Sequence, residues 1–320
     1  MPERPQIVVA KGGFLAETYR TSGLTGCLRK IGAALSMNLP LWFIGRRTNR
    51  SVGAYFDLIT DDARLFYGDC FHFGYFKAGT EGFAEALAAH TDLVGEMARL
   101  DHQKKVLDIG CGIGAPAIQL AKQYGCSILG VNISGEQVRQ GRELVAKSGL
   151  SNKITISEGN ALALTATDSS IDSILCLEVA GDICVTKEQK TKLIDEMYRV
   201  LKPGGSIGFS DLVFTGKPSM DEEKAMRMIL YHSGAELVTD WPALFEKRGF
   251  VIQEKRNILP QTMKTWDHTV AIYEERAAEV DERYGKAIAN KTRRYLREIP
   301  KILQKYAAFP VLSIQKPLLV

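Results

Sequence analysis

The sequence of 320 residues lacks several features that would assign it to a functional class directly. Its six cysteines form no Cys-x-x-Cys pair and show no metal-ligand spacing, so neither a zinc site nor a redox motif is indicated. It has no internal repeat and no low-complexity segment. A net charge of only +4 gives no basic footprint for nucleic acid. We therefore expect a cytoplasmic globular enzyme with reduced cysteines, no bound metal and no nucleic-acid partner.

Long apolar runs are also scarce. The run from Ile31 to Ile44 is too short to cross a bilayer, and Asn38 and Pro40 interrupt it. Basic residues flank it at positions 29–30 and 46–47. We interpret this run as a helix that packs over the active site. The alternative is a helix seated on a membrane surface, which would give the protein a peripheral membrane contact.

A glycine-rich turn between an apolar strand and a helix is the most informative motif, and it lies within Val106–Ala115. Glycines at Gly110 and Gly112 let the backbone pass close under a ligand. The spacing of Gly110, Gly112 and Ala115 also fits a dinucleotide fingerprint. However, Asp108 at the end of the strand would repel an anionic pyrophosphate and attract a cation. We therefore interpret the turn as a site for S-adenosylmethionine (SAM), which brings an ammonium and a sulfonium.

Two further strands are predicted to end near ligand-binding side chains. The strand Ser127–Asn132 ends in Asn132, close to the position of the ribose-binding residue in nucleotide folds. The strand Ile154–Ser157 leads into residues 158–161, where a polar side chain can meet an adenine edge. The alternation then continues with a strand at Ile174–Val179, a helix over 193–201 that is stopped by residues 202–205, and a strand from Ile207 to Phe214.

This order of elements resembles the class I SAM-dependent methyltransferases over roughly residues 85 to 215. The resemblance implies an α/β fold: a Rossmann-like sheet with helices on both faces. It implies that the methionine part is held by Asp108, Gly110 and Gly112, the ribose by Asn132, and the adenine by Asn160 and Ala161. Asn132 and Asn160 depart from the family, in which acids are usual at both positions.

An aromatic-rich segment, residues 55–76, precedes this core and contains nine aromatic side chains, counting His72. Its Tyr-x-Asp and Phe-His-Phe motifs resemble those of sterol C-methyltransferases, cyclopropane fatty acid synthases and tocopherol methyltransferases. Phe56 stands where many of these relatives have a second Tyr that touches the cofactor carboxylate, so we assign that contact to Tyr55. Residues 133–137 resemble the same families, which implies cofactor contacts from Ile133 and Gln137.

Methylation of an alkene leaves a carbocation on the carbon skeleton, and aromatic faces stabilise such a cation by roughly 1–2 kcal/mol each. A base must then remove a proton. We favour Glu178, because the end of the fourth strand faces the ligand crevice, with His72 as the second candidate and His232 and His268 as further options. The aromatic residues expected to shelter the cation are Tyr67, Phe71, Phe73 and Tyr75. The simpler alternative is that Phe66, Phe71 and Phe73 are core residues.

The C-terminal part is predicted to enclose a bulky substrate. Strands are expected at Phe250–Lys255 and Phe309–Gln315, the second one antiparallel, with a helical insertion between them. The apolar face of the insertion consists of Val280, Tyr284, Ile288, Tyr295, Ile299 and Ile302. The opposite, basic face consists of Arg283, Lys286, Lys291, Arg293, Arg294, Arg297, Lys301 and Lys305. We interpret the basic face as solvated charge; the alternatives are a grip on a substrate diphosphate or attraction to an anionic membrane.

We divide the chain into an N-terminal lid (1–84), a SAM-binding core (85–259), a helical cap insertion (260–308) and the last strand of the core sheet (309–320). The predicted function is C-methylation of an isoprenoid alkene, either sterol-like or a prenyl diphosphate that brings Mg²⁺, with rearrangement or cyclisation as an option. The alternatives are O- or N-methylation of a small natural product and a catalytically silent binding subunit that has the SAM fold. The sequence predicts no oligomeric state.

Overall fold

The computed structural model describes residues 49–184, 186–230 and 238–318. The apolar run Ile31–Ile44 and the candidate base His232 lie outside these residues. Within the described residues, no helix combines the length and apolar character that a membrane crossing requires.

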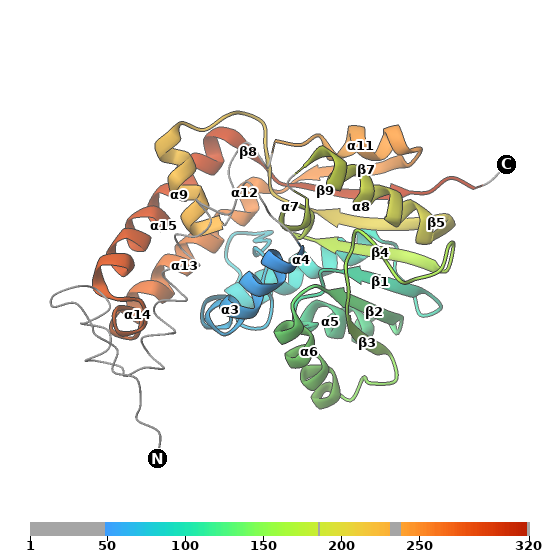
Figure 1. Ribbon diagram of the computed structural model, residues 1–320, viewed down its shortest axis with the longest axis horizontal. Coiled ribbons are helices and arrows are strands. Elements are labelled where there is room, and N and C mark those ends of the chain that lie inside the picture. The colour runs from blue at the N-terminus through green and yellow to red at the C-terminus, as the bar shows by residue number, and fades with distance from the viewer. Residues whose placement is uncertain (1–48, 185, 231–237, 319–320) are drawn as a thin grey trace, which may run out of the picture.

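A central seven-stranded sheet forms the core, with strand order β3-β2-β1-β4-β5-β9-β7 (Figure 1). The first five strands in this order are parallel to one another, and β9 is antiparallel to both of its neighbours. The α/β fold with a Rossmann-like sheet is therefore confirmed. The strands are β1 (Lys105–Ile109), β2 (Ser127–Asn132), β3 (Ile154–Glu158), β4 (Ile171–Leu177), β5 (Leu201–Ser210), β7 (Val251–Asn257) and β9 (Pro310–Gln315).

Helices cover both faces of the sheet because its strands are apolar on both sides. Val106 belongs to one hydrophobic cluster, whereas its neighbour Leu107 belongs to the other, as alternation along a strand requires. The first cluster is completed by α4 (Phe83–Met97), α5 (Ala115–Tyr124) and α6 (Gly135–Ser148). The second is completed by the short α7 (Ala180–Ile183), α8 (Lys187–Val200) and α11 (Trp241–Arg248).

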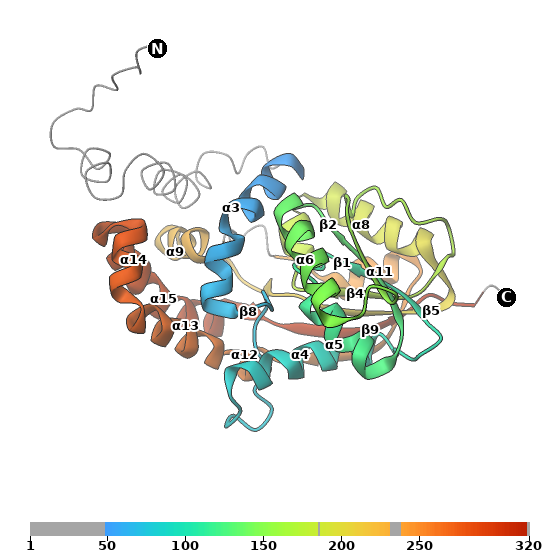
Figure 2. The same cartoon turned by 90° about the horizontal axis from the view of Figure 1, so that it is seen from below.

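A helical cap stands beside the sheet and contains α9 (Met220–Leu230), α12 (Leu259–Thr262), α13 (Lys264–Glu275), α14 (Ala277–Tyr284) and α15 (Lys286–Tyr306) (Figure 1). Although α9 precedes the expected insertion, it packs against α15. The short strands β6 (Val213–Phe214) and β8 (Ala307–Ala308) pair where the cap meets the core. The remaining helix, α3 (Asn49–Tyr67), contacts both α6 and α13 (Figure 2).

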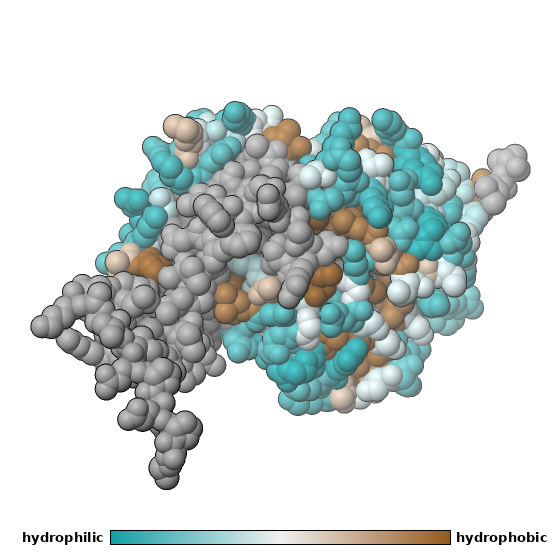
Figure 3. Space-filling view, in the orientation of Figure 1, coloured by the Kyte–Doolittle hydropathy of each residue, from teal (hydrophilic) through white to brown (hydrophobic). Residues whose placement is uncertain are grey.

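The cap helices bury three residues of the predicted apolar stripe and do not form one continuous helix. Val280, Ile299 and Ile302 are buried, and Gly285 at φ 83° separates α14 from α15. Part of the basic face is paired with acids: Arg293 with Asp281, Arg297 with Glu274, and Lys305 with Glu222. In the space-filling view, apolar side chains gather between the cap and the sheet, whereas the outer rims are mainly hydrophilic (Figure 3).

Several strand boundaries differ from the prediction, mainly those of β4 and β5. β5 begins at Leu201, six residues before the expected start at Ile207, in the segment expected to end a helix and turn. β4 ends at Leu177, and Glu178 after it has a φ of 52°, so the backbone turns out of the strand two residues before the expected end at Val179. The expected strand from Ile207 to Phe214 is divided into β5 and β6. The reason is that Val213 and Phe214 pair with β8 rather than with the central sheet.

The close approach of α4 to β5 leads to a prediction about the stability of a Gly208 variant. A Cβ atom at Gly208 would lie 2.1 Å from the carbonyl oxygen of Val94. Gly208→Ala should therefore lower the free energy of unfolding by about 2 kcal/mol or more, measured by urea denaturation. At Gly135 an added Cβ would meet only a Glu158 oxygen at 3.5 Å, so Gly135→Ala should change stability by less than about 0.5 kcal/mol. Equal stability of the two variants would contradict this packing.

Candidate active site

A pocket opens at the carboxyl ends of the first four parallel strands, where α/β folds bind ligands. Its volume is about 730 Å³ including the open mouth. Nine residues singled out from the sequence line it: Phe71, Gly110, Gly112, Asn132, Ile133, Gln137, Asn160, Ala161 and Glu178. Helix α3 closes one side of the pocket with Val52 and Phe56. These two apolar side chains are spaced at i and i+4, which is the signal that could have identified them.

The glycine turn has the close backbone approach that its sequence predicts. Gly110 has φ 68°, and a Cβ there would lie 2.2 Å from Cγ2 of Val179. Gly112 has φ 56°, and the nearest atom to its would-be Cβ is in the Phe71 ring, at 3.7 Å. Larger residues would therefore clash at the first position and project toward Phe71 at the second.

A second cavity adjoins the first, and Phe71, Gly110, Gly112 and Leu177 line both. Asp108 lines this second cavity, and only 4% of its surface is exposed to solvent. Its Oδ2 atom is buried without a hydrogen-bond partner among the described residues. Burial raises the pKa of this carboxyl group to about 7. A carboxylate in this position is suited to an ammonium ligand, because a cation would supply the partner that Oδ2 lacks.

Polar residues order the loop after β2, which is predicted to face the ribose. The Asn132 Nδ2 group donates to Gln137 Oε1 at 2.7 Å and to the Gly112 carbonyl at 3.2 Å. Asn132 thereby links the loop to the glycine turn. Asn160 Oδ1 accepts from the Leu162 N–H at 2.9 Å, which leaves the Asn160 NH₂ group to face an acceptor in the pocket.

One main-chain peptide joins the aromatic segment to the end of β4. The Phe73 N–H donates to Glu178 Oε1 at 2.8 Å. The Phe73 carbonyl accepts from His90 Nδ1 at 2.8 Å and from His72 Nδ1 at 3.0 Å. His90 Nδ1 also lies 3.2 Å from Glu178 Oε1. We call this set the Phe73 clamp. His90 lies on α4, and no local motif in the sequence indicated that it would take part.

Both ring nitrogens of His72 already have neighbours, which disfavours His72 as the catalytic base. Its Nδ1 must carry a proton to donate to the Phe73 carbonyl, and its Nε2 faces Thr91 Oγ1 at 3.2 Å. Burial and the neighbouring His90 lower the pKa of His72 to about 3, which makes it a weak proton acceptor. His72, His90 and Glu178 also form the one group of potential metal ligands among the described residues. The clamp engages His72 Nδ1, His90 Nδ1 and Glu178 Oε1, whereas His90 Nε2 is buried without a hydrogen-bond partner among the described residues.

The aromatic residues of the lid divide between the pocket and the core. Only Phe71 of the four expected rings lines the pocket. Phe73 instead packs in the core, with its ring 5.3 Å from that of Trp266 and 5.6 Å from that of Phe309. Tyr75 packs against the same cluster. The sheltering role predicted for Phe73 and Tyr75 is therefore wrong, because their rings help to join the lid to the cap.

Tyr67, Tyr55 and His268 also lie away from the pocket lining. The Tyr67 hydroxyl pairs with Thr269, and burial, with a smaller contribution from Glu178, raises its pKa. Tyr55 was expected to contact the cofactor, but Phe56 lines the pocket instead, since one step along a helix turns the side chain by about 100°. His268 stacks on Phe83 with 3.8 Å between the ring centroids and is therefore not a candidate base.

Comparisons with known proteins agree with this geometry. A family described as "Methyltransferase domain" matches residues 106–205. The methyltransferase GfsG of Streptomyces halstedii is 30% identical over 222 residues, which covers 68% of this chain and 78% of that protein. The sterol 24-C-methyltransferase of Debaryomyces hansenii is 30% identical over 193 residues, covering 60% of this chain and 49% of that protein. The chain thus spans about half the length of this sterol relative.

The chain belongs to the class I SAM-dependent methyltransferases. Within them it is similar in sequence to sterol 24-C-methyltransferases over part of their length and in fold to cyclopropane synthases. The fold of the cyclopropane synthase MmaA2 from Mycobacterium tuberculosis matches with a TM-score of 0.75 at 17% identity, over 84% of this chain and 99% of that one. The 4+2 cyclase SpnF matches with a TM-score of 0.69 at 25% identity, over 85% and 97% of the two chains.

The residues present fit SAM. The unpartnered Asp108 Oδ2 lies where the ammonium of the methionine part is expected, and the glycine turn leaves room beside it. Asn132, Gln137 and Asn160 offer amide groups along the rest of the pocket. The contacts assigned to each of these residues remain predictions.

The pKa of Asp108 gives a pH prediction for cofactor binding. Affinity for S-adenosylhomocysteine (SAH) should rise about tenfold between about pH 5.5 and 7 as Asp108 ionises, and then level off, measured by calorimetry. Asp108→Asn should bind SAH more weakly and without this rise.

The stability of the ligand-free protein should fall over the same pH range in which the affinity for SAH rises. A carboxyl pKa raised from 3.8 to about 7 lowers the free energy of unfolding as pH increases through that range. A wild-type affinity that does not change with pH would contradict the assignment.

Proposed function

We propose that this methyltransferase transfers a methyl group from SAM to a carbon atom of a neutral, sterol-like isoprenoid alkene. The observation that carries the proposal is the lining of the pocket around Glu178. The apolar side chains of this lining include Val52, Phe56, Phe71, Leu177, Val179 and Ile183. The charged residues in this lining are the acids Glu178 and Asp182. Such a wall suits an apolar acceptor that becomes cationic during the reaction.

The same lining disfavours a prenyl diphosphate. Neither cavity has a Lys or Arg among its described lining residues, and a diphosphate needs such partners. The basic residues of α15 do not line either cavity, and four of them are paired with acids. We therefore propose the sterol-like acceptor over the diphosphate, and a reaction without Mg²⁺. Similarity to sterol 24-C-methyltransferases supports the same choice.

The proposed chemistry assigns separate tasks to three side chains. Bound SAM would supply an electrophilic methyl group. Phe71 and Phe56 offer ring faces to the carbocation left on the acceptor, worth about 1–2 kcal/mol each when water is excluded. Glu178 is placed to remove the proton that ends the reaction, since it lines the pocket and its Oε1 accepts from the Phe73 N–H, with His90 Nδ1 3.2 Å away.

A substrate panel tests the type of reaction. The protein is incubated with SAM that carries a ¹³C methyl group and with a sterol unsaturated in its side chain, prenyl diphosphates or phenols. We expect a product methyl signal in the aliphatic or allylic region of the NMR spectrum, from the sterol and not from the diphosphates. A methoxy or N-methyl signal would instead establish O- or N-methylation and overturn the proposal. Failure to bind SAM would indicate a silent subunit.

Variants of Glu178 test the base. Glu178→Gln retains an acceptor oxygen for the Phe73 N–H but cannot take up the proton. We expect it to bind SAH within about threefold of wild type and to lose about 10²-fold or more in kcat. Asp182→Asn, which neutralises the other pocket acid, is the matched control and should retain kcat within about tenfold. Full activity of Glu178→Gln would eliminate Glu178 as the base.

A further inference from the structure

We propose that Asp57 on α3 is a positioning residue for the cofactor site, although it does not line the pocket. Its carboxylate fixes the loop Asn132–Gln137 through Ser134, so that docking of α3 and binding of SAM strengthen each other. The inference concerns only the cofactor half of the site, and it holds whichever acceptor is methylated.

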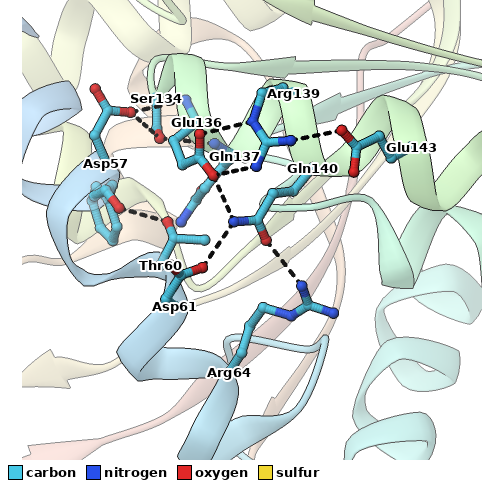
Figure 4. Close-up of polar contacts among 11 residues, drawn as sticks. Asp57, Thr60, Asp61, Arg64, Ser134, Glu136, Gln137, Arg139, Gln140 and Glu143 are labelled. Carbon is cyan, nitrogen blue, oxygen red and sulfur yellow. Dashed lines mark hydrogen bonds and ion pairs between the residues drawn. The ribbon is translucent and has the colours of Figure 1, made fainter.

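A chain of hydrogen bonds leads from Asp57 to the pocket (Figure 4). Asp57 Oδ1 accepts from Ser134 Oγ at 2.6 Å and from the Glu136 N–H at 3.0 Å. Ser134 Oγ in turn accepts from the Gln137 N–H at 3.1 Å as the N-cap of α6. Gln137 Oε1 accepts from Asn132 Nδ2 at 2.7 Å. Asp57 therefore reaches both amide residues of the loop Asn132–Gln137.

The packing of α3 on the same loop is close. A Cβ at Gly53 would lie 2.9 Å from the Ile133 carbonyl oxygen, so only glycine allows this approach. One turn further along α3, Phe56 joins Val52 in lining the pocket. The ligand site is therefore bounded on one side by α3 and on the adjacent side by the loop that Asp57 holds. A ligand that contacts both sides favours the docked position of α3, and by linkage docked α3 favours the ligand.

The next turn of α3 supplies an internal control. Asp61 Oδ1 accepts from Gln140 Nε2 at 3.0 Å, and Arg64 donates to Gln140 Oε1 at 3.1 Å (Figure 4). These bonds also join α3 to α6 at Gln140, whose Nε2 in turn donates to Glu136 Oε1 at 2.7 Å. Neither Gln140 nor Glu136 lines the pocket. Asp57 and Asp61 are thus two carboxylates on one helix that differ in whether their hydrogen bonds lead through Ser134 to the pocket-lining residues Gln137 and Asn132.

The test compares SAH affinity in Asp57→Ala and Asp61→Ala by calorimetry. We expect Asp57→Ala to raise the SAH Kd about tenfold, because it leaves the Ser134 and Glu136 donors unpaired. Asp61→Ala should remain within about twofold of wild type. Asp57→Asn keeps an acceptor oxygen for both donors and should restore affinity to within about threefold. An equal loss in both alanine variants, or normal binding by Asp57→Ala, would overturn the proposal.

Two further measurements, hydrogen exchange and a double variant, distinguish this coupling from a purely structural role of Asp57 in holding α3. SAH should slow amide exchange in α3 in the wild type and in Asp61→Ala but not in Asp57→Ala. Asp57→Ala combined with Ser134→Ala should bind SAH no more weakly than Asp57→Ala alone, since both break one connection. If Asp57→Ala does not fold, Ser134→Ala carries the test. Additive losses, or SAH protection of α3 that does not depend on Asp57, would contradict the coupling.

Discussion

The peptide group of Phe73 is the constraint on which the active site depends. Its N–H is held by Glu178 and its carbonyl by two imidazoles, so both polar atoms of a buried peptide are satisfied by side chains of the lid and the core. This clamp brings Phe71 over the glycine turn and Glu178 to the pocket together. Glu178 accepts a left-handed backbone conformation to do so, at a cost of order 1–3 kcal/mol, which is common at functional sites.

The charged side chains of the site suit the proposed reaction, in which a cationic cofactor binds first and a carbocation then forms on the acceptor. Asp108 lies in one cavity and Glu178 in the other, and Phe71 lines both. Asp108 lacks a partner and is suited to a cation that arrives with the ligand. In the proposed reaction, a cation formed on an alkene near Glu178 would be flanked by apolar side chains, and any water that entered would trap it. Exclusion of that water by the lid therefore matters as much as any single contact.

The glycine turn and the strand order could be predicted because their signals are local or periodic. In Val106–Ala115 the strand, the carboxylate and the glycines are adjacent in the sequence. The lid could be recognised but not oriented. In a regular strand Phe71 and Phe73 would share a face, but the chain bends at His72, so one ring lines the pocket and the other enters the core. His90 and Asp57 could not be predicted, since their partners are distant in the sequence and are brought to them only by the packing of helices.

The most direct test of the account is a crystal structure of the protein with SAH. The account predicts that the SAH amine nitrogen lies within about 3 Å of Asp108 Oδ2. It also predicts that the Phe73 N–H remains bonded to Glu178, with the Phe71 ring beside the sulfur atom. An amine that pairs elsewhere, or a lid whose Phe73 peptide is released from Glu178 when SAH is bound, would contradict it.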